Sequence, residues 1–171
     1  NFFRDLIKVY LDWFRNINAW QARRNQSIQQ LEFPYDDFRP GQRDMAVAVY
    51  KAIRANDRLF VQSPTGVGKT IATLFPAVKA LGQGLAAKIF YLTAKTPGRL
   101  VAEKALDDMR QSNLDLKSVT LTAKEKICFC PPVNCDPEVC MFARGYFDKV
   151  KQALGEMDQH QAFTRPLIEE I

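Results

Sequence analysis

The chain has 171 residues, of which 47% are hydrophobic and 25% are charged, a balance typical of a globular protein and not of a collagen-like or largely disordered one. The longest uncharged apolar stretch, near Thr70–Val78, is far shorter than the roughly 20 residues that a membrane-spanning helix needs. The 24 Lys and Arg exceed the 19 Asp and Glu, and this net charge of +5 is compatible with a polyanionic partner without demonstrating one.

The ends of the chain predict a segment of a longer protein. The first residue is Asn1 and not Met, and the charges at Arg4 and Asp5 come too early for the apolar core of a secretory signal. The last residues, Leu167–Ile171, stop in the middle of a pattern. We therefore expect no targeting segment.

Residues 2–31 predict the first helix. Hydrophobic residues recur there at three- and four-residue spacing: Phe3, Ile7, Tyr10, Phe14 and Ile17. We favour a packing helix over a membrane-surface helix because the polar face carries Asp5 and Asp12 besides its basic residues. Residues 1–32 are thus predicted to form an N-terminal helical linker.

A loop and a second helix follow. Two prolines and a glycine fall within Phe33–Gly41, which predicts a loop. The segment from Gln42 to Ala55 carries Met45 and Val49 on one face and predicts a helix.

Three strand-like segments then alternate with helical ones. The predicted strands are Leu59–Gln62, Lys88–Leu92 and Ser118–Leu121, and the predicted helices run from a glycine-rich turn to about Leu81 and over Arg99–Gln111. Strands that alternate with helices predict a parallel α/β sheet.

The glycine-rich turn is the strongest motif of the chain. The segment reads Ser63, Pro64, Thr65, Gly66, Val67, Gly68, Lys69, Thr70 and matches the phosphate-binding pattern G-x-x-x-x-G-K-[ST], with Ser63 in place of the first glycine. The two glycines allow a tight turn whose N–H groups approach phosphate oxygens, while Lys69 reaches the β- and γ-phosphates and the Thr70 hydroxyl binds Mg²⁺. The alternative is a glycine-rich turn with a surface lysine. The strand before and the helix after it favour nucleotide binding.

Gln42 is a second candidate for nucleotide contact. Its amide offers donors and an acceptor that match the edge of adenine, and Tyr35 or Phe38 could stack on the ring. On its chemistry alone, Gln42 is more simply interpreted as an exposed helix residue.

These features resemble a known family. Gln42 and Met45, followed by the segment Ser63–Thr70, resemble the start of superfamily 2 helicases, in which a small residue commonly replaces the first glycine. The segment Tyr91–Thr96 is similar to the helicase segment that touches the DNA backbone, and a cysteine cluster follows the third predicted strand. This order resembles the iron–sulfur helicases of the DinG/XPD type over roughly Phe33–Leu154.

The resemblance implies an α/β fold and a DNA contact. Residues 33–122 would form the first, incomplete part of a RecA-like P-loop NTPase domain, a parallel sheet flanked by helices, and residues 123–171 would begin a small cysteine-rich insertion. Gln42 would bind adenine. Thr93, Lys95, Thr96 and Arg99 would lie on single-stranded DNA. The alternative for Thr96 is a helix cap, since Pro97 follows it.

All four cysteines, Cys128, Cys130, Cys135 and Cys140, fall in one short segment with the spacing C-x-C-x₄-C-x₄-C. Disulfides are disfavoured because no secretory signal precedes a nucleotide-binding pattern. Spacing alone leaves zinc and an iron–sulfur cluster open. The resemblance implies a [4Fe–4S] cluster, with Cys130, Cys135 and Cys140 similar to the three closely spaced cysteines of these helicases.

The sequence lacks two parts of a helicase motor, the acidic motif that binds Mg²⁺ and activates water and a second motor domain that supplies arginine fingers. No Asp-Glu motif ends an apolar strand, because Asp107 and Asp108 lie inside a predicted helix and Glu169 and Glu170 follow no strand. The resemblance therefore implies the N-terminal part of an ATP-dependent DNA helicase that binds single-stranded or forked duplex DNA and moves 5′ to 3′ in repair or replication, in the bacterial cytoplasm. Alone, it would bind ATP and Mg²⁺ weakly without hydrolysis. The alternative is a zinc-stabilised, nucleotide-binding regulatory module.

Overall fold

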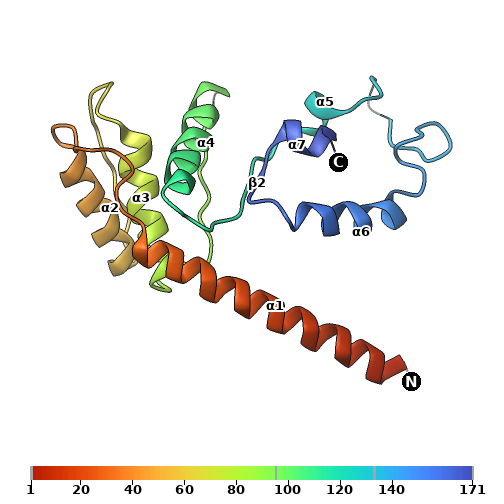
Figure 1. The fold of residues 1–171 in the computed structure, drawn as a ribbon. Helices are drawn as coiled ribbons and strands as arrows, with labels where there is room; N and C mark the ends of the chain where they lie inside the picture. The colour runs from red at the N-terminus through yellow and green to blue at the C-terminus, as the bar shows by residue number, and fades with distance from the viewer. Residues whose placement is uncertain (1, 95, 133, 171) are drawn as a thin grey trace. The chain divides into compact units, whose positions relative to one another are not determined.

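The computed structural model describes residues 2–94, 96–132 and 134–170. The chain separates into two compact units, Asn1–Asp115 and Leu116–Ile171 (Figure 1). The first unit holds the helices α1 (Phe2–Gln30), α2 (Gln42–Ala55), α3 (Lys69–Gly82) and α4 (Thr96–Gln111). The second holds β1 (Ser118–Val119), α5 (Lys124–Ile127), α6 (Tyr146–Met157), β2 (Ala162–Phe163) and α7 (Arg165–Glu170).

The core of the first unit is built around α3, which lies between α2 and α4 and contacts both of them and α1 (Figure 1). Its sequence is apolar on nearly every side, as expected for a central helix. The buried apolar side chains of α3 are Ile71, Ala72, Leu74, Pro76, Val78, Ala80 and Leu81. Met109 of α4 and Leu114 after it are also buried, so the helices share one core.

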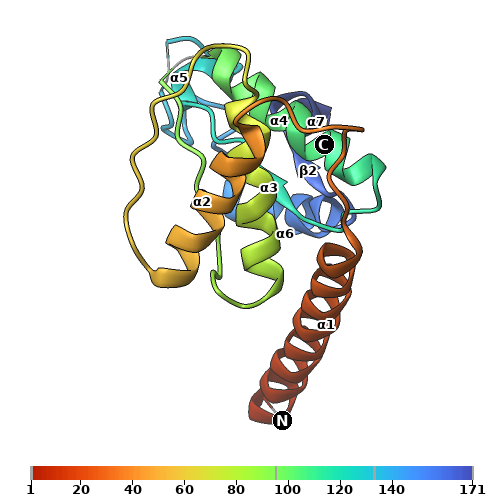
Figure 2. The same cartoon turned by 90° about the vertical axis from the view of Figure 1, so that its left-hand side faces the viewer.

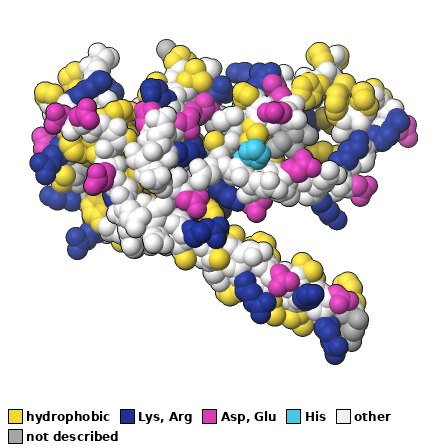
Figure 3. All heavy atoms as spheres, in the orientation of Figure 1, with side chains coloured by type: hydrophobic (Ala, Val, Ile, Leu, Met, Phe, Trp, Pro, Cys, Tyr) yellow, Lys and Arg dark blue, Asp and Glu magenta, His cyan; other side chains and the backbone are white. Residues whose placement is uncertain are grey.

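Only the C-terminal end of α1 joins this core. Ile28 is buried against Gly82 of α3, where an added Cβ would overlap the Ile28 side chain. Lys79 of α3 donates hydrogen bonds from Nζ to the carbonyls of Ile28 (2.8 Å) and Gln29 (3.1 Å), which lie in the last turn of α1. The N-terminal half extends away from the other helices of its unit (Figure 2) and exposes hydrophobic side chains (Figure 3).

The structure confirms the predicted helices. The helix α2 has the predicted bounds, and it lies between Gly41 and Asn56, which both adopt left-handed backbone angles (φ 73° and 53°). The predicted helix after the glycine-rich turn is α3, and the predicted helix over Arg99–Gln111 begins three residues earlier, at Thr96.

Two of the three predicted strands are not formed. Neither Leu59–Gln62 nor Lys88–Leu92 is a strand, and Phe60 and Leu92 are 93% and 90% exposed. A strand is defined by its hydrogen-bonded neighbour. Among the described residues, the one ladder joins β1 to β2, so these two segments have no neighbour to pair with. The parallel sheet of a P-loop domain therefore stays a prediction.

The second unit has a small parallel pair of strands. Ser118 pairs with Ala162 and Val119 with Phe163, which confirms the start of the predicted strand Ser118–Leu121. Its buried side chains include Leu116 and Cys140. The predicted domain boundary between residues 122 and 123 falls inside this unit. No helix among the described residues has both the length and the apolar character required to cross a membrane.

Candidate nucleotide-binding loop and cysteine cluster

The segment Ser63–Thr70 forms a tight turn that leads directly into α3. Gly66 and Gly68 have φ angles of +87° and +81°, a backbone conformation that side chains disfavour and glycine accepts. Gly68 occupies the N-cap position of α3, and no side chain caps the first N–H groups of the helix. These N–H groups and the helix dipole form a suitable site for an anion.

Lys69 turns back over this loop. Its Nζ donates hydrogen bonds to the carbonyls of Ser63 (3.0 Å) and Pro64 (2.6 Å), and its side chain is exposed. Within the described part of the chain, no carboxylate pairs with this ammonium group. Lys69 therefore carries a positive charge at the loop that no acidic side chain neutralises.

Thr70 and Tyr91 lie at the edge of a second feature, a cavity of about 580 Å³ next to the loop. The Thr70 Oγ1 is 3.5 Å from the Tyr91 hydroxyl, and Thr73 Oγ1 donates to the carbonyls of Lys69 and Thr70. Among the described residues, the Thr70 hydroxyl thus has only this long contact, which leaves it available to another ligand. A larger cavity, of about 680 Å³, has no residue of the Ser63–Thr70 loop in its wall.

Gln42 is buried, and its side chain links two segments of the chain. The interpretation of Gln42 as an exposed helix residue is therefore wrong. Its side chain is 2% exposed. The Oε1 accepts a hydrogen bond from the Arg39 N–H (3.0 Å), and the Nε2 donates to the Gly68 carbonyl (3.3 Å). An added Cβ at Gly68 would overlap Nε2. Its amide is therefore bound to the chain itself, and its contact with adenine stays a prediction.

Arg39 adds a second link to the same loop. Its Nη1 donates a hydrogen bond of 2.5 Å to the carbonyl of Gly66. Together with Gln42, it joins the start of α2 to both glycines of the turn. The sequence contained the Arg39–Gln42 segment, but nothing in its spacing indicated that Arg39 itself contacts the loop.

The two aromatic rings proposed for stacking on a base already have partners. Phe38 stacks on Phe33 with ring centroids 3.9 Å apart and planes at 19°. The Tyr35 hydroxyl donates to Asp108 Oδ2 (2.7 Å), which ties this loop to α4. Burial raises the pKa of Tyr35 to about 12, and the hydrogen bond to Asp108 acts in the same direction. A hydrogen bond from Lys104 lowers the pKa of Asp108. Sequence reasoning missed this link because it joins residues 73 positions apart.

The predicted DNA-contacting residues lie near the start of α4. Thr96 is the first residue of this helix and is exposed, and Thr93 lies against Gly98, where an added Cβ would overlap the threonine hydroxyl. Arg99 forms an ion pair with Glu103 (3.7 Å). Lys95 lies outside the described residues.

The four cysteines lie in one loop as free thiols. The Cys130 N–H donates to Cys128 Sγ (3.4 Å). Burial raises the pKa of Cys130, to which a hydrogen bond with Cys140 also contributes, whereas the backbone N–H of Ala143 lowers the pKa of Cys140. Four thiols are a donor set that zinc and iron–sulfur clusters accept. Nevertheless, among the described residues, no three His, Cys, Asp or Glu side chains converge closely enough to hold a metal ion.

Comparisons with known proteins relate this chain to helicases. It is 43% identical over 47 residues to a probable ATP-dependent helicase of Methanocaldococcus jannaschii, a match that covers 28% of this chain and 7% of the relative. It is 33% identical over 111 residues to the U5 small nuclear ribonucleoprotein 200 kDa helicase of Homo sapiens, covering 63% of this chain and 5% of the relative. The chain thus matches only a small part of the length of either relative. No protein-family profile and no solved structure matches it.

Proposed function

We propose that this chain binds ATP through the Ser63–Thr70 loop and forms part of the motor of an ATP-dependent helicase. The observation that carries the proposal is the loop itself. Two left-handed glycines, an unneutralised lysine and the open N-terminus of α3 meet within one turn. The partial likeness to an ATP-dependent helicase supports the same function.

Each part of the loop has a role in this proposal. The backbone N–H groups around Gly66 and Gly68 donate to phosphate oxygens, which Gly68 permits by turning the chain into α3. Lys69 exchanges the carbonyls of Ser63 and Pro64 for phosphate oxygens, which gives stronger, charge-assisted hydrogen bonds. Thr70 would hold Mg²⁺, which neutralises phosphate charge when it is bound.

The proposed fold is a RecA-like parallel sheet in which residues 59–62 and 88–92 are strands. Large apolar side chains on these segments are exposed in the chain as described, among them Phe60, Phe90 and Leu92. Exposed apolar side chains of this size favour a segment that is covered by further structure. The helices α2, α3 and α4 would then flank the sheet.

The more specific proposal is an iron–sulfur DNA helicase of the DinG/XPD type that moves 5′ to 3′ on single-stranded or forked DNA. It is supported by the resemblance of the loop, of the Tyr91–Thr96 segment and of the four-cysteine cluster. Thr93, Lys95, Thr96 and Arg99 would contact the DNA backbone. RNA should be tested beside DNA as a ligand, because one relative is named as a helicase of a ribonucleoprotein.

Nucleotide binding is tested by titrating the chain with ATP in the presence of Mg²⁺ and measuring the heat of binding. We expect Lys69→Ala to weaken ATP binding by about tenfold or more, because it removes the charge-assisted hydrogen bonds to phosphate. Lys8→Ala is the matched control, because Lys8 is an exposed lysine on α1. Equal ATP affinity in the wild type and Lys69→Ala would contradict the proposal.

Metal binding is tested by measuring iron, sulfide and zinc in the chain purified without oxygen. The iron–sulfur proposal requires iron and sulfide, whereas zinc alone supports the regulatory module. Cys130→Ser, Cys135→Ser and Cys140→Ser should each lose the metal. Cys128→Ser tests whether the fourth thiol is also a metal ligand. Cys128 lies only two positions before Cys130, which is itself a proposed ligand.

A further inference from the structure

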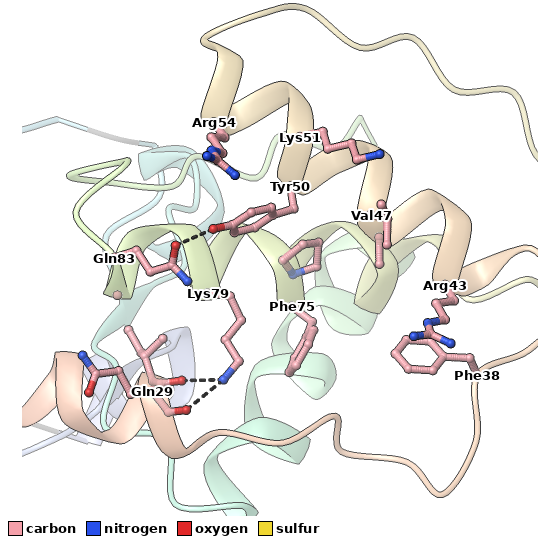
Figure 4. Close-up of a pocket in the computed structure, with 14 residues that line it drawn as sticks. Gln29, Phe38, Arg43, Val47, Tyr50, Lys51, Arg54, Phe75, Lys79 and Gln83 are labelled. Atoms are coloured by element: carbon pink, nitrogen blue, oxygen red, sulfur yellow. Dashed lines mark hydrogen bonds between the residues drawn. The ribbon is translucent and has the colours of Figure 1, made fainter.

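A groove of about 680 Å³ lies between α2, α3 and the C-terminal end of α1 (Figure 4). None of the residues of the Ser63–Thr70 loop lines it. It therefore needs an explanation separate from nucleotide binding.

The floor of the groove is apolar. Phe75 and Pro76 of α3, Val47 of α2 and Ile28 of α1 line it. Val47 is 46% exposed although α2 has its apolar core contacts elsewhere. A partner that covers this floor would gain the free energy of burying apolar surface.

One rim of the groove is strongly basic. Arg43, Lys51 and Arg54 all project from α2 (Figure 4), and none forms an ion pair or hydrogen bond within the described ranges. Their positions span 11 helical steps, which is about 16 Å along the helix axis. None of the described residues that line the groove is an Asp or a Glu.

Lys79, the fourth cation that lines the groove, already has hydrogen-bond partners. Lys79 donates to the carbonyls of Ile28 and Gln29, and its pKa is lowered by burial. The carboxylate that faces Lys79 is Glu32, whose charge acts in the opposite direction. Among the described residues, the groove cations without a hydrogen-bond or ion-pair partner are therefore those of the α2 rim.

We propose that this groove binds an acidic amphipathic helix of a partner protein. The apolar stripe of such a helix would cover Val47 and Phe75, and carboxylates on one flank would pair with Arg43, Lys51 and Arg54. An apolar floor beside a one-sided row of cations is the pattern that this mode of helix-in-groove recognition requires.

The aromatic contacts favour a peptide over single-stranded nucleic acid. Binding of bases depends on open ring faces. In this groove, Phe38 is stacked on Phe33, and Phe75 forms a T-shaped pair with Phe33 at 5.4 Å and has the Lys79 ammonium over its ring at 5.8 Å.

The test uses the whole chain and a fluorescent peptide designed as a helix of about 16 residues, longer than the cationic rim. The peptide carries Leu at three- and four-residue spacing and Glu on one flank, and binding is measured by fluorescence anisotropy. We expect Arg43→Glu combined with Arg54→Glu to weaken binding by about tenfold or more. Arg4→Glu combined with Lys8→Glu changes the net charge equally on α1 and should leave affinity within about twofold.

A charge exchange makes the test specific. A peptide with Lys in place of every Glu should bind the Arg43→Glu, Arg54→Glu variant better than it binds the wild type. If the double variant does not fold, the single change Lys51→Glu takes its place, because Lys51 is exposed. A scrambled peptide of the same composition should not bind.

Three results would overturn the proposal. The first is absence of peptide binding to the wild type, and the second is equal binding to wild type and rim variants. The third is displacement of the peptide by single-stranded oligothymidylate at equal or higher affinity, in a way that depends on Arg43 and Arg54, since this would make the groove a nucleic-acid site.

Discussion

The nucleotide loop and the cysteine loop are held in different ways. The nucleotide loop is bonded to residues far away in the sequence: Arg39 to Gly66 and Gln42 to Gly68. The cysteine loop is bonded mainly to itself, as in the contact of Cys128 with Cys130. The first loop is thus ordered by its unit before any ligand binds, whereas the second depends on contacts that close within a few residues.

The two loops should therefore lose different amounts of conformational entropy when they bind a ligand. A site whose backbone is already fixed does not lose further conformational entropy when its ligand binds. A loop with local bonds alone retains that cost, and a bound metal can offset it by tying several side chains together. Binding should therefore change the cysteine loop much more than the nucleotide loop.

The largest expected effect follows from the proposed cluster. Metal loading should slow amide hydrogen exchange over residues 128–140 by about a hundredfold or more, because a metal bound by several thiolates couples loop opening to ligand loss. Exchange over residues 63–70 should not change. Equal exchange in the loaded and metal-free chain would contradict the idea that a bound metal orders the cysteine loop.

The second prediction concerns Gly68. Gly68→Ala should lower the free energy of unfolding by about 2–4 kcal/mol, because the new Cβ adds left-handed strain and displaces the buried Gln42 amide. Gly84→Ala is the matched control, since Gly84 has φ +75° and its Cβ would meet no atom within 4 Å. It should lose only about 1–2 kcal/mol from strain.

Urea unfolding of both variants measures this difference. If Gly68→Ala lowers the free energy of unfolding no more than Gly84→Ala does, the contact of Gln42 with Gly68 does not stabilise the loop.

The third prediction tests how α1 joins the core. Gly82→Ala should cost about 1–3 kcal/mol, because its Cβ would overlap Ile28 in a closely packed site. In contrast, Gly155→Ala in α6 has open space around its Cβ and should stabilise its helix by up to about 1 kcal/mol. Thermal unfolding of both variants gives the sign, and stabilisation by Gly82→Ala would refute the contact.

The smallest expected effect is at alkaline pH. Tyr35 has a pKa of about 12 in the folded chain, whereas an unfolded tyrosine ionises near pH 10. The stability that this group contributes is present below pH 10 and is lost as the pH rises towards 12. Tyr35→Phe should therefore show a shallower fall in the free energy of unfolding over this interval. An identical pH dependence in both proteins would contradict the Tyr35–Asp108 link.

Local sequence signals predicted the helices well. Apolar spacing and the residues Gly41 and Asn56 defined the bounds of α2, and the glycine-rich pattern located the turn before α3. These features depend on neighbours within a few residues, which a sequence displays directly.

Long-range features were not predictable in this way. The burial of Gln42 depends on Gly68, and the packing of Ile28 depends on Gly82. In each case the two residues are far apart in the sequence. The predicted strands at 59–62 and 88–92 have the right composition, but composition does not supply a pairing partner.

The proposed function requires the Ser63–Thr70 loop to hold the phosphates of ATP. Amide hydrogen exchange of the chain with and without MgATP measures this at the loop itself. We expect slower exchange within residues 63–70 and at the start of α3, and loss of this protection in Lys69→Ala. Protection that falls on other segments, with residues 63–70 unchanged, would contradict it.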